Sequence, residues 1–206
     1  MNFANKLKTK LRTISETSEP AYIITQSISL PLYELDLKGL VDSDSIKERC
    51  LSRLEKVSHN TKLVKEGWQS PYYVFGTTEF EIFNDLIKIV EDKLNLITDL
   101  QKSNTKSNTK YRIDHCWFVI YGEGTYHDWH THNGKVDHFS GYSGVYYPAA
   151  SDAAQPIEFE NNDSTISIPV TKDKLILFPS VLKHRVPKCT DPDLRIAFSF
   201  NFSGWN

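Results

Sequence analysis

A cluster of histidines is the part of this sequence with the clearest capacity for chemistry. Four of the seven histidines lie between Tyr121 and Pro148, and two of them, His130 and His132, are two residues apart. On a β-strand, residues at this spacing project from the same face. Two imidazoles on one face, joined by a third ligand from a distant strand, can hold a transition metal. The sequence therefore predicts a metal site centred on this pair.

His184 is the candidate for the distant ligand, although a lone histidine in a turn is more often a surface residue. It follows the apolar run Lys174–Phe178 and precedes a second apolar run that opens with Arg195. An arginine inside an apolar strand is costly unless it meets a carboxylate, which its planar guanidinium can bind through two hydrogen bonds. That carboxylate could belong to a structural aspartate or glutamate, or to a bound dicarboxylate.

Composition excludes several classes of protein. The 206 residues are enough for one domain with a substantial core. The formal net charge of −2 does not indicate a general nucleic-acid surface. The sequence has no run of about 18 apolar residues, so it predicts no membrane span. The three cysteines, Cys50, Cys116 and Cys189, lack a paired spacing, so they predict free thiols and a cytoplasmic location.

The order of elements predicts a mainly β domain that begins with helices. Asp42–Val57 and Thr78–Leu100 carry apolar residues at helical spacing. After residue 110, short β-rich runs separated by Gly, Asp, Asn and Pro are typical of an antiparallel sandwich or barrel. We expect a single α+β domain over 1–206, with helices packed on one face of the sheet. In it, 1–110 is a helical and strand scaffold, and 111–206 carries the metal site.

The order of the β-rich runs and histidines resembles the Fe(II)- and 2-oxoglutarate-dependent oxygenases, especially their prolyl-hydroxylase-like branch. The shared order runs through YGEGT, HTH, SGVYYP, IEFE, KLILFPS and HRVP to RIAFSFNF. It covers residues 111–202, about half of the chain. Each part is short, but their order and spacing together are specific. The resemblance implies a double-stranded β-helix, or jelly roll, with helices on one side.

The resemblance also implies roles for individual residues. His130 and His184 match the two histidine ligands of Fe(II) in that family. Arg195 matches the basic residue that pairs with the far carboxylate of 2-oxoglutarate. Tyr147 matches a tyrosine that hydrogen-bonds the same carboxylate, and Tyr121 matches a tyrosine beside this cosubstrate.

The sequence departs from the family at His132, where the family usually carries Asp or Glu. One interpretation makes His132 the third ligand of a three-histidine Fe(II) site. A second gives that role to Asp128, His127 or Asp137. A third gives the site another metal, or none. A neutral imidazole in place of a carboxylate would raise the net charge of the centre without removing its open positions.

Neighbouring aromatic residues give further candidates. Trp129 and Tyr126 flank the first ligand and could form a substrate-facing wall, while Trp129 could equally pack against the sheet. Tyr146 would take the role of Tyr147 if the alignment slipped by one residue.

The function implied is a dioxygenase that hydroxylates a C–H bond while 2-oxoglutarate is decarboxylated to succinate and CO2. A prolyl residue of a peptide is the first candidate substrate, before a small molecule or a modified nucleobase. Fe(II), 2-oxoglutarate and O2 are the expected cofactors and partners, with no membrane or nucleic-acid partner, and the long helix offers a homodimer contact. The alternative is a three-histidine, cupin-like metal-binding protein or enzyme that does not use 2-oxoglutarate. Arg195 favours the oxygenase, because a metal-only cupin needs no cationic anchor.

Overall fold

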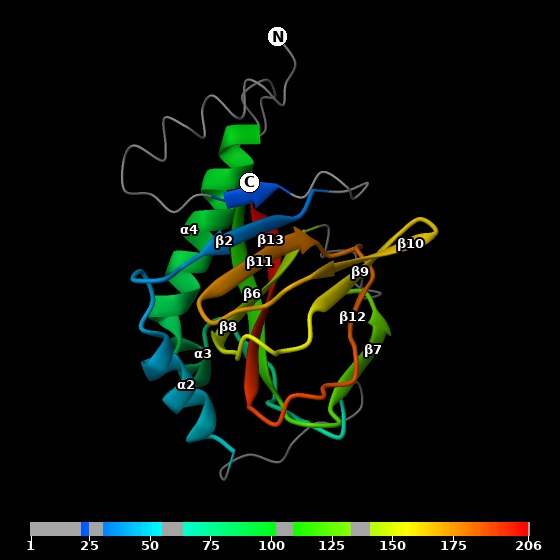
Figure 1. Cartoon of the computed structure of the whole chain (residues 1–206). Helices are drawn as coiled ribbons and strands as arrows, with labels where there is room; N and C mark the ends of the chain where they lie inside the picture. The colour runs from blue at the N-terminus through cyan, green and yellow to red at the C-terminus, as the bar shows by residue number, and fades with distance from the viewer. Residues whose placement is uncertain (1–21, 25–30, 55–63, 102–108, 133–140, 206) are drawn as a thin grey trace.

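The chain forms two facing β-sheets, with helices on the outer side of the larger one (Figure 1). This computed structural model describes residues 22–24, 31–54, 64–101, 109–132 and 141–205. Among the helices in these ranges, we find none with the length and apolar character that a bilayer span requires.

The larger sheet has eight antiparallel strands within the described residues. Their order is β1-β2-β11-β8-β13-β6-β4, and β5 also pairs with β6. The long strand β13 therefore lies at the centre, between β8 and β6. The strands are β1 (Tyr22–Ile24), β2 (Tyr33–Asp36), β4 (Trp68–Gln69), β5 (Tyr73–Val74), β6 (Lys110–Tyr121), β8 (Tyr142–Ala149), β11 (Lys174–Pro179) and β13 (Arg195–Trp205).

The smaller sheet has five strands in the described part of the chain, ordered β10-β9-β12-β7-β3. Together the two sheets form the double-stranded β-helix that the sequence predicted, so the expected fold class is confirmed. Strands from before residue 110 join both sheets. The five strands are β3 (Val64–Lys65), β7 (Tyr126–His130), β9 (Ile157–Asn161), β10 (Ser164–Ile168) and β12 (His184–Val186).

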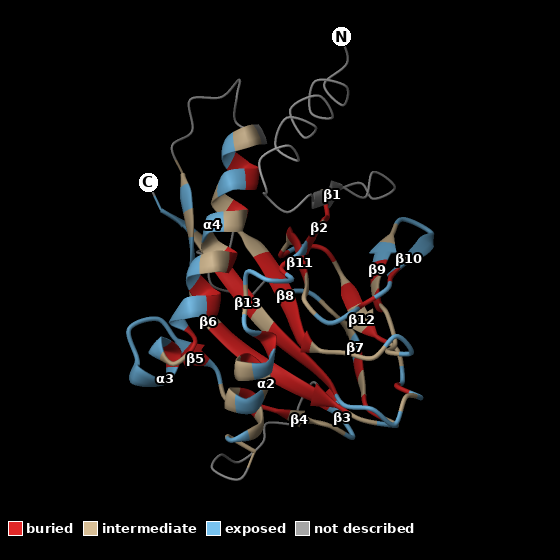
Figure 2. Cartoon of the chain, turned by 60° about the vertical axis from the view of Figure 1, so that its left-hand side comes forward, coloured by how far each residue is buried: buried red, intermediate tan, exposed pale blue. Residues whose placement is uncertain are grey.

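Helices cover the outer face of the larger sheet, as expected (Figure 2). They are α2 (Ser43–Leu51), α3 (Thr78–Glu81) and α4 (Asn84–Gln101). The side chain of Asp42 accepts a hydrogen bond from the Ser45 backbone N–H and so caps α2. The single helix expected over Thr78–Leu100 is two helices, α3 and α4. The chain turns between them, and the buried Phe83 packs there at 4.6 Å from the ring of Phe198.

Two apolar clusters follow from the alternation of side chains along the strands. Phe118, Phe198 and Phe200 point outward and pack beneath the helices. Trp117, Val119 and Ala197 are their neighbours in sequence, and they point inward, between the sheets. The inward cluster forms the walls of the cavity described below. The same alternation therefore assigns each residue either to the helix-covered core or to the space between the sheets.

Leu94 and Leu96 provide a matched test of helix packing, because both lie on α4 but are 0% and 39% exposed, respectively. We expect Leu94→Ala to lower the free energy of unfolding by about 2–5 kcal/mol, since it leaves a cavity against the sheet. Leu96→Ala should cost less than about 0.5 kcal/mol. Urea denaturation measures both, and equal losses would contradict this packing of α4.

Candidate functional site

Three histidines come together on neighbouring strands of the smaller sheet. His130 ends β7, His184 opens β12, and the two are paired in register. His132 lies just beyond β7, where its backbone N–H donates to the Ser180 carbonyl at 3.0 Å. One ring nitrogen from each histidine lies within 4.8 Å of the other two, so the three could hold one metal ion.

The Nδ1 atom of each histidine is already engaged with an oxygen. Carbonyl oxygens only accept hydrogen bonds, so each Nδ1 carries the ring proton and each Nε2 keeps its lone pair. Histidines that bind a metal commonly donate one ring N–H to an oxygen in this way and bind the metal through the other nitrogen. The contacts are His130 to the Asp128 carbonyl (2.8 Å), His184 to the Leu182 carbonyl (3.0 Å) and His132 to the side-chain carbonyl of Asn201 (2.7 Å).

Asn201 connects His132 to the larger sheet. Its Oδ1 also accepts a hydrogen bond from Ser143 Oγ at 2.9 Å, and its Nδ2 donates to His115 Nε2 at 2.9 Å. Sequence reasoning missed both Asn201 and Ser143. A signal was present, because Asn201 lies an even number of residues after Arg195 and therefore on the same face of β13.

Burial keeps the three imidazoles neutral. It lowers the pKa of His132 to about 4, and the neighbouring His130 lowers it further. Burial and the same neighbour hold the pKa of His184 well below 6.5, and burial also lowers the pKa of His130. At neutral pH the ring nitrogens are therefore free of the second proton that would compete with a metal.

Arg195 is a buried cation on the opposite sheet, only 3% exposed. Its Nη1 donates to the Gln155 carbonyl at 2.7 Å and its Nη2 to the Tyr147 hydroxyl at 3.2 Å, while its buried Nε has no partner in the part of the chain that the structure describes. Among the described residues, no carboxylate lies within 4.0 Å of this guanidinium. A buried guanidinium without a counter-charge is strongly unfavourable, so this arrangement favours an anionic ligand.

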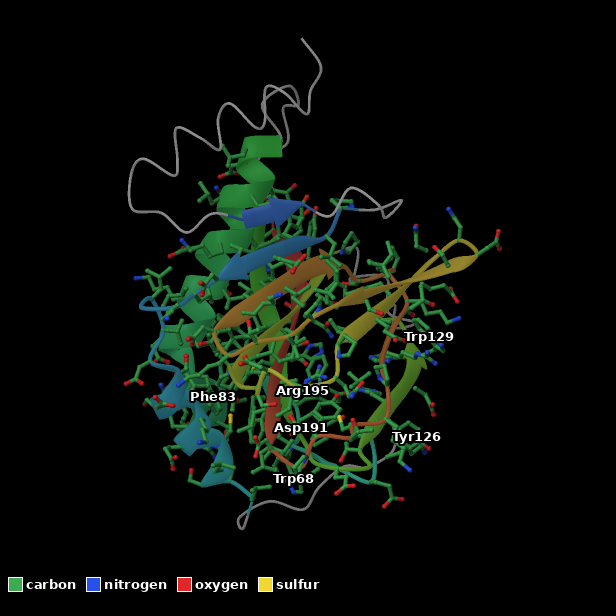
Figure 3. All side chains as sticks on the ribbon, viewed as in Figure 1. Trp68, Phe83, Tyr126, Trp129, Asp191 and Arg195 are labelled. Carbon is green, nitrogen blue, oxygen red and sulfur yellow. The ribbon has the colours of Figure 1, made fainter. Side chains whose placement is uncertain are left out.

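The three histidines and Arg195 line one narrow cavity between the sheets, with a volume of about 40 Å³. Figure 3 shows Arg195 in the interior, between the strands of the two sheets. A larger hollow of about 630 Å³ lies beside β2 and β11, but its described lining residues include no histidine. The narrow cavity is therefore the one of these two that is lined by potential metal ligands of the histidine type.

Comparison with known proteins supports the fold. No protein-family model matches the chain, and no curated protein matches it in sequence. Solved structures do match. A prolyl-4-hydroxylase from Pseudomonas putida has a TM-score of 0.60 at 14% identity, over 85% of this chain and 93% of that one. This chain therefore shares its fold, a double-stranded β-helix, with that prolyl-4-hydroxylase.

Two further structures with this fold were solved with ligands. A prolyl hydroxylase from Trichoplax adhaerens, in complex with a hypoxia-inducible-factor peptide, has a TM-score of 0.59 at 14% identity, over 98% of this chain and 94% of that one. HygX from Streptomyces hygroscopicus, with nickel and 2-oxoglutarate bound, has a TM-score of 0.56 at 12% identity, over 94% of this chain and 86% of that one. Such low identities establish the architecture alone.

The two tyrosines of the SGVYYP segment face opposite ways. Tyr147 points into the cavity, where the guanidinium of Arg195 lies 4.9 Å from its ring. Tyr146 points to the helix side, and its hydroxyl is hydrogen-bonded to Ser43 Oγ at 2.7 Å. Tyr121 lines the cavity, with its ring also 4.9 Å from the guanidinium. The structure thus brings Tyr121 and Tyr147 to the arginine and keeps Tyr146 away from it.

Trp129 and Tyr126, the proposed substrate-facing residues, lie on the outer side of β7 (Figure 3). The Trp129 ring is covered by Arg185, whose guanidinium carbon is 4.7 Å from its centroid, and by Lys183, whose amine is 5.6 Å away. Neither aromatic residue is among the described residues that line the cavity. The structure therefore does not bring them to the histidines, and Trp129 packs against Arg185 of the neighbouring strand β12 and against Lys183, which precedes that strand.

The alternative third ligands are placed differently from His132. The Asp128 side chain is exposed, and it is the residue's backbone carbonyl that contacts His130. His127 lines the cavity, but its ring stacks on that of His130, with centroids 4.0 Å apart and an interplanar angle of 14°. Asp137 lies outside the described residues. Of the described candidates, His132 is the one grouped with His130 and His184.

The contact between Asn201 and His132 predicts a measurable effect on metal binding. Asn201→Leu should lower the affinity for Ni(II) by roughly 10- to 100-fold, because the imidazole of His132 loses the acceptor that orients it. Asn201→Asp keeps an acceptor oxygen and should lose less. Isothermal titration calorimetry measures both variants, and wild-type affinity in Asn201→Leu would contradict this role.

The histidine cluster also predicts a pH dependence for the metal-free protein. Burial and neighbouring histidines lower the pKa of His127 from 6.5 to about 3 in the folded state. Below pH 6.5 the unfolded chain therefore binds the extra proton, and the free energy of unfolding falls. His127 should account for about 2 kcal/mol of the loss in the free energy of unfolding between pH 7 and pH 5. Urea denaturation at both pH values measures the loss, and His127→Gln should remove that share. An unchanged pH dependence in the variant would contradict the assignment.

Proposed function

We propose that this protein is an Fe(II)- and 2-oxoglutarate-dependent dioxygenase that hydroxylates a C–H bond. The observation that carries the proposal is the buried Arg195, which has no acidic partner among the described residues and shares a cavity with three neutral histidines. A dicarboxylate with a 2-oxo group satisfies both ends of this cavity. Its far carboxylate meets the guanidinium, and its oxo-acid end faces the histidines.

The donor set fits a divalent transition metal. His130, His132 and His184 would hold it through their Nε2 atoms, since each Nδ1 is already used. Three protein ligands leave further coordination positions open. When bound, Fe(II) together with 2-oxoglutarate supplies the activation of O2, with decarboxylation of the oxo acid to succinate and CO2.

The chain's own residues position the cosubstrate and exclude water. Arg195 and the Tyr147 hydroxyl offer converging donors for the far carboxylate, and their mutual contact of 3.2 Å orients both groups. Val119, Ile157 and Phe178 line the same cavity and give it apolar walls. Such walls strengthen the interaction between the guanidinium and a bound anion.

A peptide or a small molecule is the proposed substrate, with a prolyl residue of a peptide as the first candidate. The fold is shared with a prolyl hydroxylase solved with its peptide, which supports this order of preference. The three buried, free thiols agree with the proposed cytoplasmic location. A homodimer contact through α4 stays a prediction.

The alternative function is a three-histidine, cupin-like metal protein that does not use 2-oxoglutarate. His132 favours this alternative, because the oxygenases that the chain resembles usually carry a carboxylate at this position. Arg195 counts against it, because a metal site alone leaves this buried cation without an anion. The two proposals therefore differ in one measurable property, the binding of 2-oxoglutarate.

Two arginines allow a matched test of that property. Arg195 faces the cavity, whereas Arg185 pairs with Glu158 on the smaller sheet at 2.6 Å and has a side chain 40% exposed. In Ni(II)-loaded protein, Arg195→Gln should weaken 2-oxoglutarate binding by about 1.5–3 kcal/mol, the range for a hydrogen bond to a charged group. Arg185→Gln should leave it unchanged.

Calorimetry measures the binding, and succinate formation in Fe(II)-loaded wild-type protein measures the reaction. A wild-type protein that takes up metal but does not bind 2-oxoglutarate at millimolar concentration would reject the oxygenase and favour the alternative.

A further inference from the structure

His127 lines the cavity, and the proposed function gives it no role. It lies on β7 an odd number of residues before His130, so a regular strand would point the two side chains to opposite faces. The pairing of β7 with β12 is irregular here. His184 pairs with His130, and Val186 pairs with His127. An advance of two residues along β12 therefore matches three residues along β7. This bulge turns His127 to the same side as His130.

The orientation of the His127 ring argues against a fourth metal ligand. Its ring is nearly parallel to that of His130, at an angle of 14° and a centroid separation of 4.0 Å. A metal ion lies close to the plane of each imidazole that binds it. One ion cannot lie in two parallel planes that are stacked, so His130 can bind the metal while His127 stands beside it.

The two ring nitrogens of His127 have different surroundings. The side chain is 7% exposed, its Nδ1 is 3.5 Å from the Tyr121 hydroxyl, and its buried Nε2 has no partner among the described residues. We assign the Tyr121 hydroxyl as the donor and Nδ1 as the acceptor in this contact. With Nδ1 accepting, the ring proton sits on Nε2, which makes it a buried N–H donor that lacks an acceptor.

His127 also lies between the two ends of the proposed cosubstrate site. Its ring stacks on His130 on one side, and its Nδ1 contacts Tyr121, whose ring lies 4.9 Å from the Arg195 guanidinium. A buried donor at this place costs free energy until a ligand supplies an acceptor. A 2-oxo acid that spans the cavity would place a carboxylate oxygen near this donor.

We infer that His127 is a positioning residue for the 2-oxo acid, an inference that rests on the proposed function. Its Nε2–H donates to a carboxylate oxygen of the cosubstrate at the oxo-acid end, beside the metal. Arg195 and Tyr147 hold the other end. The cavity therefore binds the two ends of the cosubstrate through separate donors, one neutral and one cationic.

The test compares ligand binding with metal binding in two variants. His127→Phe keeps a flat ring against His130 but has no donor, and His127→Gln keeps a side-chain N–H. Calorimetry with Ni(II)-loaded protein should show 2-oxoglutarate affinity about 10-fold lower in His127→Phe, with a smaller loss in His127→Gln. Ni(II) affinity should stay at the wild-type value in both.

Wild-type 2-oxoglutarate affinity in His127→Phe would overturn the inference and leave the proposed function intact. A parallel loss of Ni(II) affinity would also overturn it, because His127 would then support the metal. Failure of the wild-type protein itself to bind 2-oxoglutarate would reject both proposals.

A measurement on the wild-type protein does not depend on how the variants fold. Nitrogen-15 NMR of the Zn(II)-loaded protein should show the His127 proton on Nε2, and the signal should shift when 2-oxoglutarate is added. A proton on Nδ1, or no shift at saturating ligand, would overturn the inference.

Discussion

The alternation of side chains along β13 is the constraint on which both the core and the site depend. This strand lies at the centre of the larger sheet, so both of its faces are covered. Phe198 and Phe200 fill the space beneath the helices, while Arg195 and Asn201 reach the space between the sheets. A shift of one residue would bury the arginine under the helices and expose phenylalanines to the cavity. The packing energy of the core therefore also fixes the position of the site.

Charge explains why the cavity favours an anion. Its described lining includes four neutral histidines and one arginine, and no acidic side chain. In the proposed centre, a divalent metal adds two positive charges, and His132 contributes none of the negative charge that a carboxylate would supply. A dianionic oxo acid offsets most of this excess. Binding of metal and cosubstrate should therefore be more strongly coupled here than in a centre that contains a carboxylate ligand.

His132 and Asn201 are connected by a chemical requirement. A carboxylate ligand has no ring proton to place, whereas an imidazole binds a metal through one nitrogen only when the other holds the proton. His130 and His184 meet this need with backbone carbonyls two residues away. His132 meets it with a side chain from the opposite sheet, at 2.7 Å. His132 is thus the proposed ligand whose orientation depends on contact between the two sheets.

The sequence by itself determined the fold class and the two helical regions, and it predicted the residues of the proposed centre, because these follow from periodicity and from the order of short motifs. It also indicated Arg195, since an arginine in an apolar strand needs an anionic partner. Tertiary structure decided which side chains reach the cavity. Register separated Tyr147 from Tyr146, and packing against cations placed Trp129 on the outside.

The bulge in β7 brought His127 beside His130, and contact between the sheets joined Asn201 to His132. Spacing along a chain predicts a face only while the strand is regular. A bulge changes that parity, and it arises from pairing with a distant strand, which local sequence does not specify.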